Sequence, residues 1–155
     1  MLTSRRVQTQ PAQALVWLAV AIPLFITTAG LAIDGGVLLN ARRQLQSATD
    51  GAARAAATRL DMSRLRASGG ADVQLDADLA NRAARAYLDQ AFAADSHSWQ
   101  NVPRTDVEVG ARRVHVQVHA QLRTAFLQIV RIDAVPVEAG AFADVQFGIH
   151  DGSGG

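Results

Sequence analysis

The sequence holds one pair of residues whose types and spacing could bind a metal ion. His115 and His119 are four residues apart, a spacing that lets two imidazoles on one helix share an ion. They fall in a segment where apolar and polar residues alternate, which is typical of a strand. Side chains four positions apart on a strand are separated by about 13 Å. The pair therefore predicts a solvated strand face, and no metal or other cofactor is expected.

Other catalytic chemistry lacks its usual motifs. The chain contains no cysteine, so thiolate nucleophiles, zinc-thiolate sites and disulfides are excluded. Gly69-Gly70 lacks the lysine and the helix context of a phosphate-binding loop. Asp72, Asp76 and Asp78 suit the start of a helix better than a calcium site. A net charge of +1 creates no field that would attract nucleic acid. We therefore expect a protein that is not an enzyme.

Asp34 is the polar residue that stands out, because it ends an uncharged stretch from Val7 to Ile33. A carboxylate next to hydrocarbon is costly unless it is hydrated or paired. Two interpretations are open. Asp34 marks the water boundary and caps the part of the helix that follows, or it pairs with an arginine or a free amine of a neighbouring subunit and fixes the register of an assembly.

The apolar segment Ala14 to Ile33 is long enough to cross a bilayer, which takes about 20 residues as a helix. Pro23 is tolerated in a membrane helix, and Trp17 suits the headgroup level. A buried core helix and a cleavable signal peptide are the alternatives. Arg5-Arg6 and Gly30-Leu31-Ala32 fit a signal peptide, but the apolar run is longer than usual for one. The sequence favours an uncleaved anchor with a cytoplasmic N-terminus.

The helical pattern continues from Asp34 to Leu60 without a proline. Small and apolar residues recur there at steps of three and four, which places them in one stripe along the helix. We predict that this stripe packs on another helix, either within the chain or in a neighbouring subunit. The candidate packing or assembly residues are Asp34, Leu38, Ala41, Leu45, Gln46, Ala48, Asp50, Ala52 and Ala55.

After Leu60 the pattern predicts a small α+β domain. A loop at 68–72 precedes a second helix from Asp78 to about Ala94, capped by Asp76 or Asp78. Alternating valines around the turn 110–112 predict a hairpin, 124–130 is ambiguous, and 134–147 suits a last strand with Pro136 at an edge. The expected organisation is a cytoplasmic tail (1–13), a transmembrane helix (14–33), its extramembrane continuation (34–60), a periplasmic domain with the second helix packed on an antiparallel sheet (61–150), and a disordered tail (151–155).

A series of short motifs along residues 12 to 57 resembles a known family. In chain order they are the uncharged span, Ile33-Asp34-Gly35-Gly36, Ala41-Arg42-Arg43-Gln44-Leu45-Gln46, Ala48-Thr49-Asp50-Gly51-Ala52-Ala53 and an alanine run. This order is similar to the N-terminal region of TadE/TadG-like proteins of the tight-adherence (Tad, or Flp) pilus machinery. Pro11-Ala12-Gln13-Ala14 supplies neither the glycine nor the glutamate of processed TadE-type pseudopilins, so the resemblance is to an uncleaved, TadG-like form.

The resemblance implies a membrane-anchored, non-enzymatic assembly component, minor pilin-like or accessory, of a pilus and secretion system used in cell adhesion. It would be anchored in the bacterial inner membrane with its C-terminal domain in the periplasm. It would act by helix–helix packing through the alanine-rich stripe, while the external domain contacts partners. The implied partners are the lipid bilayer, other membrane proteins of the Tad system, pilin subunits and, as a further option, copies of the chain itself. Two alternatives are a periplasmic binding or sensor module on the same anchor and a secreted protein whose leader is removed.

Overall fold

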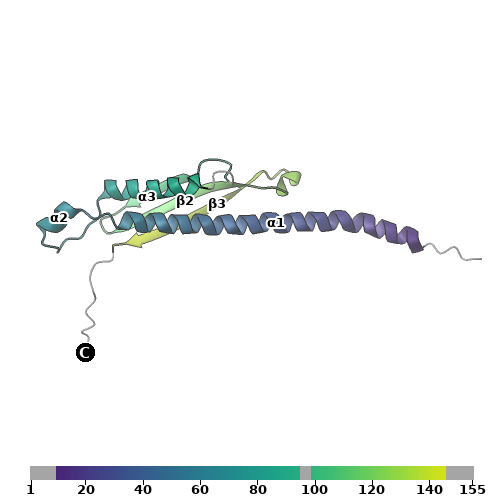
Figure 1. Ribbon diagram of the computed structural model, residues 1–155, viewed down its shortest axis with the longest axis horizontal. Coiled ribbons are helices and arrows are strands. Elements are labelled where there is room, and N and C mark those ends of the chain that lie inside the picture. Colours follow the sequence, from purple (N-terminus) through teal and green to yellow (C-terminus); the bar gives the residue numbers. More distant parts are fainter. Residues whose placement is uncertain (1–9, 95–98, 146–155) are drawn as a thin grey trace, which may run out of the picture.

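The computed structural model describes residues 10–94 and 99–145. Its dominant element is the helix α1 (Gln10–Ala57), which runs without interruption for 48 residues (Figure 1). Neither Pro23 nor Gly35-Gly36 ends it. The hydroxyl of Thr27 donates a hydrogen bond of 2.8 Å to the carbonyl of Pro23. This bond uses the helix's own backbone, so the polar group in this apolar stretch is satisfied within the helix. The predicted continuous helix is confirmed, but it ends at Ala57 and not at Leu60, which forms an isolated bridge with Leu75.

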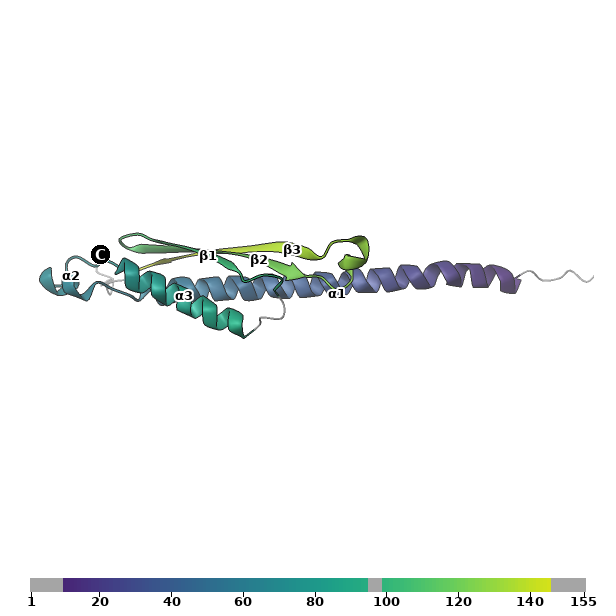
Figure 2. The same ribbon diagram turned by 90° about the horizontal axis from the view of Figure 1, so that it is seen from above.

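The two halves of α1 have different surroundings. The N-terminal half extends alone, whereas α3 and the sheet lie along the C-terminal half (Figures 1 and 2). An 18-residue window in α1 has a mean hydropathy of 2.2, and only 6% of it is buried. By length and composition this helix can cross a membrane. Its exposure argues against a core helix, which would be buried. Its exposed apolar side chains include Leu15, Val16, Trp17, Leu18, Val20, Ile22, Leu24, Phe25, Ile26, Leu31 and Ile33.

Two shorter helices follow. The six-residue α2 (Met62–Ala67), which the sequence pattern did not reveal, is capped by Asp61. The helix α3 (Ala77–Ala93) is capped by Asp76, whose carboxylate accepts a hydrogen bond of 2.9 Å from the backbone N–H of Leu79. The second predicted helix is therefore confirmed, with the cap at the first of its two candidate positions.

The sheet has three antiparallel strands in the order β1-β2-β3. They are β1 (Arg104–Val109), β2 (Arg113–Arg123) and β3 (Ala134–Asp144). The predicted hairpin turn is present and is closed by a bond of 2.8 Å from the N–H of Gly110 to the carbonyl of Arg113. The ambiguous segment before β3 contains a short 3-10 helix, η1 (Leu127–Val130). Pro136 lies in β3, an edge strand. Residues 146–147, predicted to extend this strand, and the tail 151–155 lie outside the described residues.

The core lies between one face of the sheet, α3 and the C-terminal half of α1. Every second residue of β2 from Val114 to Leu122 is buried, because side chains alternate between the two faces of a strand. The opposite face is mainly polar. The predicted α+β class, with a helix packed on an antiparallel sheet, is confirmed. The helix α1 is the central element of this core, which contains Ala41, Leu45, Ala52, Ala53, Ala56, Leu75, Ala80, Ala84, Leu88, Trp99, Val114, Val116, Val118, Ala120, Leu122, Val137, Ala139 and Ala141.

Candidate functional site at the junction around Asp34

The predicted stripe along α1 lies against the chain's own sheet and α3. Ala41, Leu45 and Ala52 are buried in the core, and Leu38 and Ala48 are partly buried against it. Ala55 is partly exposed. Of the two alternatives for the stripe, the structure provides the contacts for packing within the chain. The small side chains let α1 lie close to its neighbours, so the same residues that suit helix association build this domain.

Gln46 and Asp50 are more exposed and lie where α1 runs beside β3. The amide of Gln46 donates hydrogen bonds to a carboxylate oxygen of Asp50 (3.1 Å) and to the carbonyl of Gly140 (3.0 Å). The second bond occupies a backbone carbonyl of the edge strand β3. Unpaired backbone groups of an edge strand can otherwise pair with a strand of another chain. Gln46 therefore helps to attach the edge strand β3 to α1.

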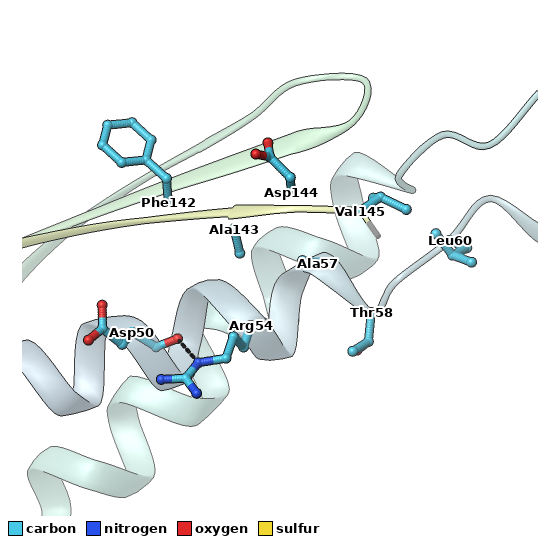
Figure 3. Close-up of a pocket in the computed structure, with 9 residues that line it drawn as sticks. All are labelled: Asp50, Arg54, Ala57, Thr58, Leu60, Phe142, Ala143, Asp144 and Val145. Carbon is cyan, nitrogen blue, oxygen red and sulfur yellow. Dashed lines mark hydrogen bonds between the residues drawn. The ribbon is translucent and has the colours of Figure 1, made fainter. Parts of the chain in front are cut away.

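An open groove of ≈ 860 Å³ lies farther along, between the C-terminal end of α1 and β3. Figure 3 shows Ala143 pointing from β3 toward α1, whereas Phe142 and Asp144 point to the other side of the strand. Asp144 forms an ion pair with Arg113, whose Nε and one terminal nitrogen donate hydrogen bonds of 2.6 and 3.0 Å to the two carboxylate oxygens of Asp144. The hydrogen bonds from Arg113 hold the pKa of Asp144 below its ordinary value. Arg113 and Asp144 therefore form an exposed ion pair at the end of the hairpin.

Asp34 is the one charged residue that is buried among the residues that the structure describes. Asp34 is only 6% exposed, and its carboxylate accepts three backbone hydrogen bonds from the connection between β2 and β3. The donors are the N–H groups of Ala125 (3.0 Å), Phe126 (2.9 Å) and Leu127 (2.6 Å). These N–H groups lie at the start of η1, where a helix has no carbonyl partners of its own. Asp34 thus caps η1 from a distant part of the chain.

The charge of Asp34 follows from these contacts. Burial raises the pKa of this carboxyl, but the three backbone hydrogen bonds outweigh it and hold the pKa of Asp34 below its ordinary value of 3.8. The carboxylate is therefore ionised at neutral pH. Of the two interpretations that the sequence left open, neither included this contact: α1 continues through Asp34, and the donors belong to its own chain.

A second contact closes the junction one turn earlier in α1. Gly30 is buried beneath Phe126, and a Cβ at this glycine would lie 2.6 Å from Cδ1 and 2.7 Å from Cγ of the phenyl ring. Only glycine leaves room for so close an approach. Leu31 and Leu127 line an adjoining cavity of ≈ 240 Å³ together with Asp34. The β2–β3 connection is therefore attached to α1 at two successive turns, one contact polar and one apolar.

The two histidines have separate partners on the polar face of the sheet. His115 stacks on Phe142 with ring centroids 4.2 Å apart and lies 3.6 Å from Glu108. His119 lies 3.3 Å from Glu138. Within residues 10–94 and 99–145, no three histidine or acidic side chains gather in a way that could hold a metal ion.

Comparison with known protein families gives a match that covers the part of the chain that forms α1. Residues 12–59 match the family described as Tad, putative Flp pilus-assembly TadE/G-like. This match confirms the resemblance that the motifs along α1 predicted. No curated protein and no solved structure matches the chain.

The TadE/G-like segment covers nearly all of α1 and includes Asp34, whereas the loop that binds Asp34 lies beyond it. Sequence reasoning identified the carboxylate but missed Phe126 and the backbone donors. The available signal was the apolar run at 124–130, whose secondary structure was ambiguous. Gly30 was noted only as part of a cleavage motif, because nothing in the sequence reveals which residue will lie on it.

Proposed function

We propose that this chain is a membrane-anchored, non-enzymatic assembly component, minor pilin-like or accessory, of a Tad/Flp-type pilus and secretion system. One observation carries the proposal: the TadE/G-like segment is a single helix whose first half is apolar and exposed and whose second half is the centre of a folded domain. This arrangement suits a span in the inner membrane with a periplasmic domain attached rigidly to it. We place the N-terminus in the cytoplasm because Arg5 and Arg6 lie slightly closer to the span than Arg42 and Arg43 and add to the charge of the terminal amine, whereas Asp34 begins the other side.

The mechanism that we propose is helix–helix packing in the membrane. The extramembrane stripe is already covered by the chain's own sheet and α3, so packing against other subunits would use the exposed N-terminal half of α1. Small residues let membrane helices approach closely, and Ala29 and Ala32 lie in this half. The partners would be membrane proteins and pilin subunits of the same system, or further copies of this chain.

The proposal can be tested in the host cell. Removing the gene should abolish pilus production and surface adherence, and the wild-type chain supplied in trans should restore both. A chain in which Leu24 is replaced by a photo-crosslinking residue should form adducts with other pilus-system proteins or with itself. The matched control carries the same residue at Arg85, an exposed position on α3. Normal pili and normal adherence in the deletion strain would contradict the proposal.

A further inference from the structure

The connection between β2 and β3 exposes apolar side chains at one particular place on the molecule. Six of its eight residues from Ala125 to Ile132 are apolar. Ile129 is 80% exposed, and the side chains of Phe126 and Ile132 are also exposed. A folded domain in water gains nothing by exposing an isoleucine to this extent next to two more apolar side chains, so the surface needs an explanation.

This connection is well ordered by its own bonds. The N–H of Thr124 donates to the carbonyl of Asp133 over 3.2 Å, and the hydroxyl of Thr124 donates to the carbonyl of Ile132. Arg131 ends η1 in the left-handed region, with φ of 65°. A residue other than glycine rarely adopts this conformation, and it persists where the surrounding structure imposes it. The exposed side chains are therefore carried on a backbone turn that these bonds hold in place.

The position of the connection along α1 identifies what it faces. In both views it lies at the end of the sheet nearest the N-terminal half of α1 (Figures 1 and 2). Asp34, which binds it, directly follows the predicted span 14–33, and Gly30, which lies beneath Phe126, is inside that span. At about 1.5 Å per residue, Gly30 lies roughly 5 Å inside the end of the span. If α1 crosses the membrane, Phe126 is at the depth of the acyl boundary.

We propose that the β2–β3 connection is a second membrane contact, in which Phe126, Ile129 and Ile132 enter the outer boundary of the same bilayer that α1 crosses. Interfacial elements bury their apolar side about 5–10 Å into this region, which matches the level set by Gly30. Arg123 precedes the apolar side chains and Arg131 lies between Ile129 and Ile132; both are exposed, so they can bind lipid phosphates. This inference rests on the proposed span, and its lipid partner is the hydrocarbon and headgroup boundary.

The absence of cysteine from the chain makes a direct test simple. Three single-cysteine variants of the full chain are labelled with an environment-sensitive fluorophore: Ile129→Cys at the proposed contact, Leu18→Cys in the span, and Phe142→Cys as the control. Phe142 is 67% exposed, comparable to Ile129, but lies at the far end of β3. Each variant is placed in phosphatidylcholine–phosphatidylglycerol vesicles with or without bromine on the lipid tails.

We expect brominated lipid to reduce the fluorescence at positions 129 and 18 and to leave position 142 unchanged. Blue-shifted emission at 129 should accompany the quenching. If the label at 18 is quenched while the label at 129 emits as in water, the inference is wrong and the anchor remains. Emission at 129 that is shielded from water but not quenched by brominated lipid would mean a protein partner, which also overturns it. If neither 18 nor 129 is quenched, the anchor and the inference both fail.

Discussion

Replacing Leu45 with alanine tests whether the stripe of α1 is the core of this domain or a surface for other subunits. Leu45 is 0% exposed and belongs to the cluster formed by α1, α3 and the sheet. Removing a fully buried leucine side chain costs about 2–5 kcal/mol, from lost transfer energy and from the cavity left behind. We expect a loss of about 3 kcal/mol, because the backbones of α1 and the sheet restrict collapse of the site.

The loss should be visible as a lower melting temperature. For a domain of this size, 1 kcal/mol corresponds to about 4–8 °C, so Leu45→Ala should lower the midpoint of the domain's unfolding by roughly 12–24 °C. The measurement is thermal unfolding of the full chain in detergent micelles, followed by circular dichroism.

The matched control for this substitution is Leu39→Ala. Leu39 lies on the same helix but is 59% exposed, so its replacement should change stability by no more than about 0.5 kcal/mol. Equal midpoints for the two variants would refute the reasoning, because they would mean that the buried stripe does not support the fold.

Three further predictions concern the caps and the junction. Because the pKa of Asp34 is lowered in the folded state, its carboxylate stabilises the fold above pH 4, and this stabilisation is lost as the pH falls through the folded-state pKa. Asp34→Asn should remove the part of the acid dependence of stability that Asp34 causes. Unfolding midpoints between pH 3 and 6 measure the difference. Gly30→Ala should destabilise the protein by about 1–3 kcal/mol, because the added Cβ overlaps Phe126. Gly36→Ala meets open space and should raise stability by up to about 1 kcal/mol. Similar changes in stability for the two variants would contradict the close contact between Gly30 and Phe126. Asp76→Ala should lower the free energy of unfolding by about 1 kcal/mol and Asp76→Asn should hardly change it, because only alanine removes the cap of α3. Equal denaturant midpoints for the two variants would exclude a capping role for Asp76.

The sequence allowed the elements to be predicted because each has a strong local signal. The uncharged run and the absence of proline after it predict α1, and the alternating valines of β2 predict a strand buried on one face. Asp76 was found because caps are local. The six-residue α2 was missed because a helix this short has too few turns to create a period.

The site could be predicted only in part, for a physical reason. Asp34 stood out because a carboxylate next to hydrocarbon is unusual. Its partners are backbone N–H groups 91 to 93 residues away, and every residue except proline has such a group, so no residue type marks them. The close approach of Phe126 to Gly30 likewise depends on tertiary packing, which no local pattern encodes.

The junction also predicts a hinge in α1 at Gly35-Gly36, which the bonds between Asp34 and the β2–β3 connection keep from bending. Gly35 and Gly36 directly follow Asp34 in α1, and each weakens a helix by about 1 kcal/mol relative to alanine. Nothing lies within 4 Å of where their Cβ atoms would be, so packing does not require glycine at either position. Outside the apolar span, α1 is therefore weakened by two adjacent glycines just beyond Asp34, the residue that binds the β2–β3 connection.

Removing the hydrogen bonds of Asp34 should therefore allow α1 to bend at these glycines. We expect Asp34→Ala to broaden the distribution of distances between spin labels placed on Leu18→Cys in the span and Phe142→Cys in the domain, measured by pulsed electron paramagnetic resonance in lipid nanodiscs. Adding Gly35→Ala and Gly36→Ala should narrow the distribution again, because alanine strengthens the helix without restoring the bonds to the loop. A distribution that stays as narrow in Asp34→Ala as in the wild type would mean that α1 alone keeps the domain fixed to its anchor. A broad distribution that the two alanines do not narrow would place the flexibility outside α1.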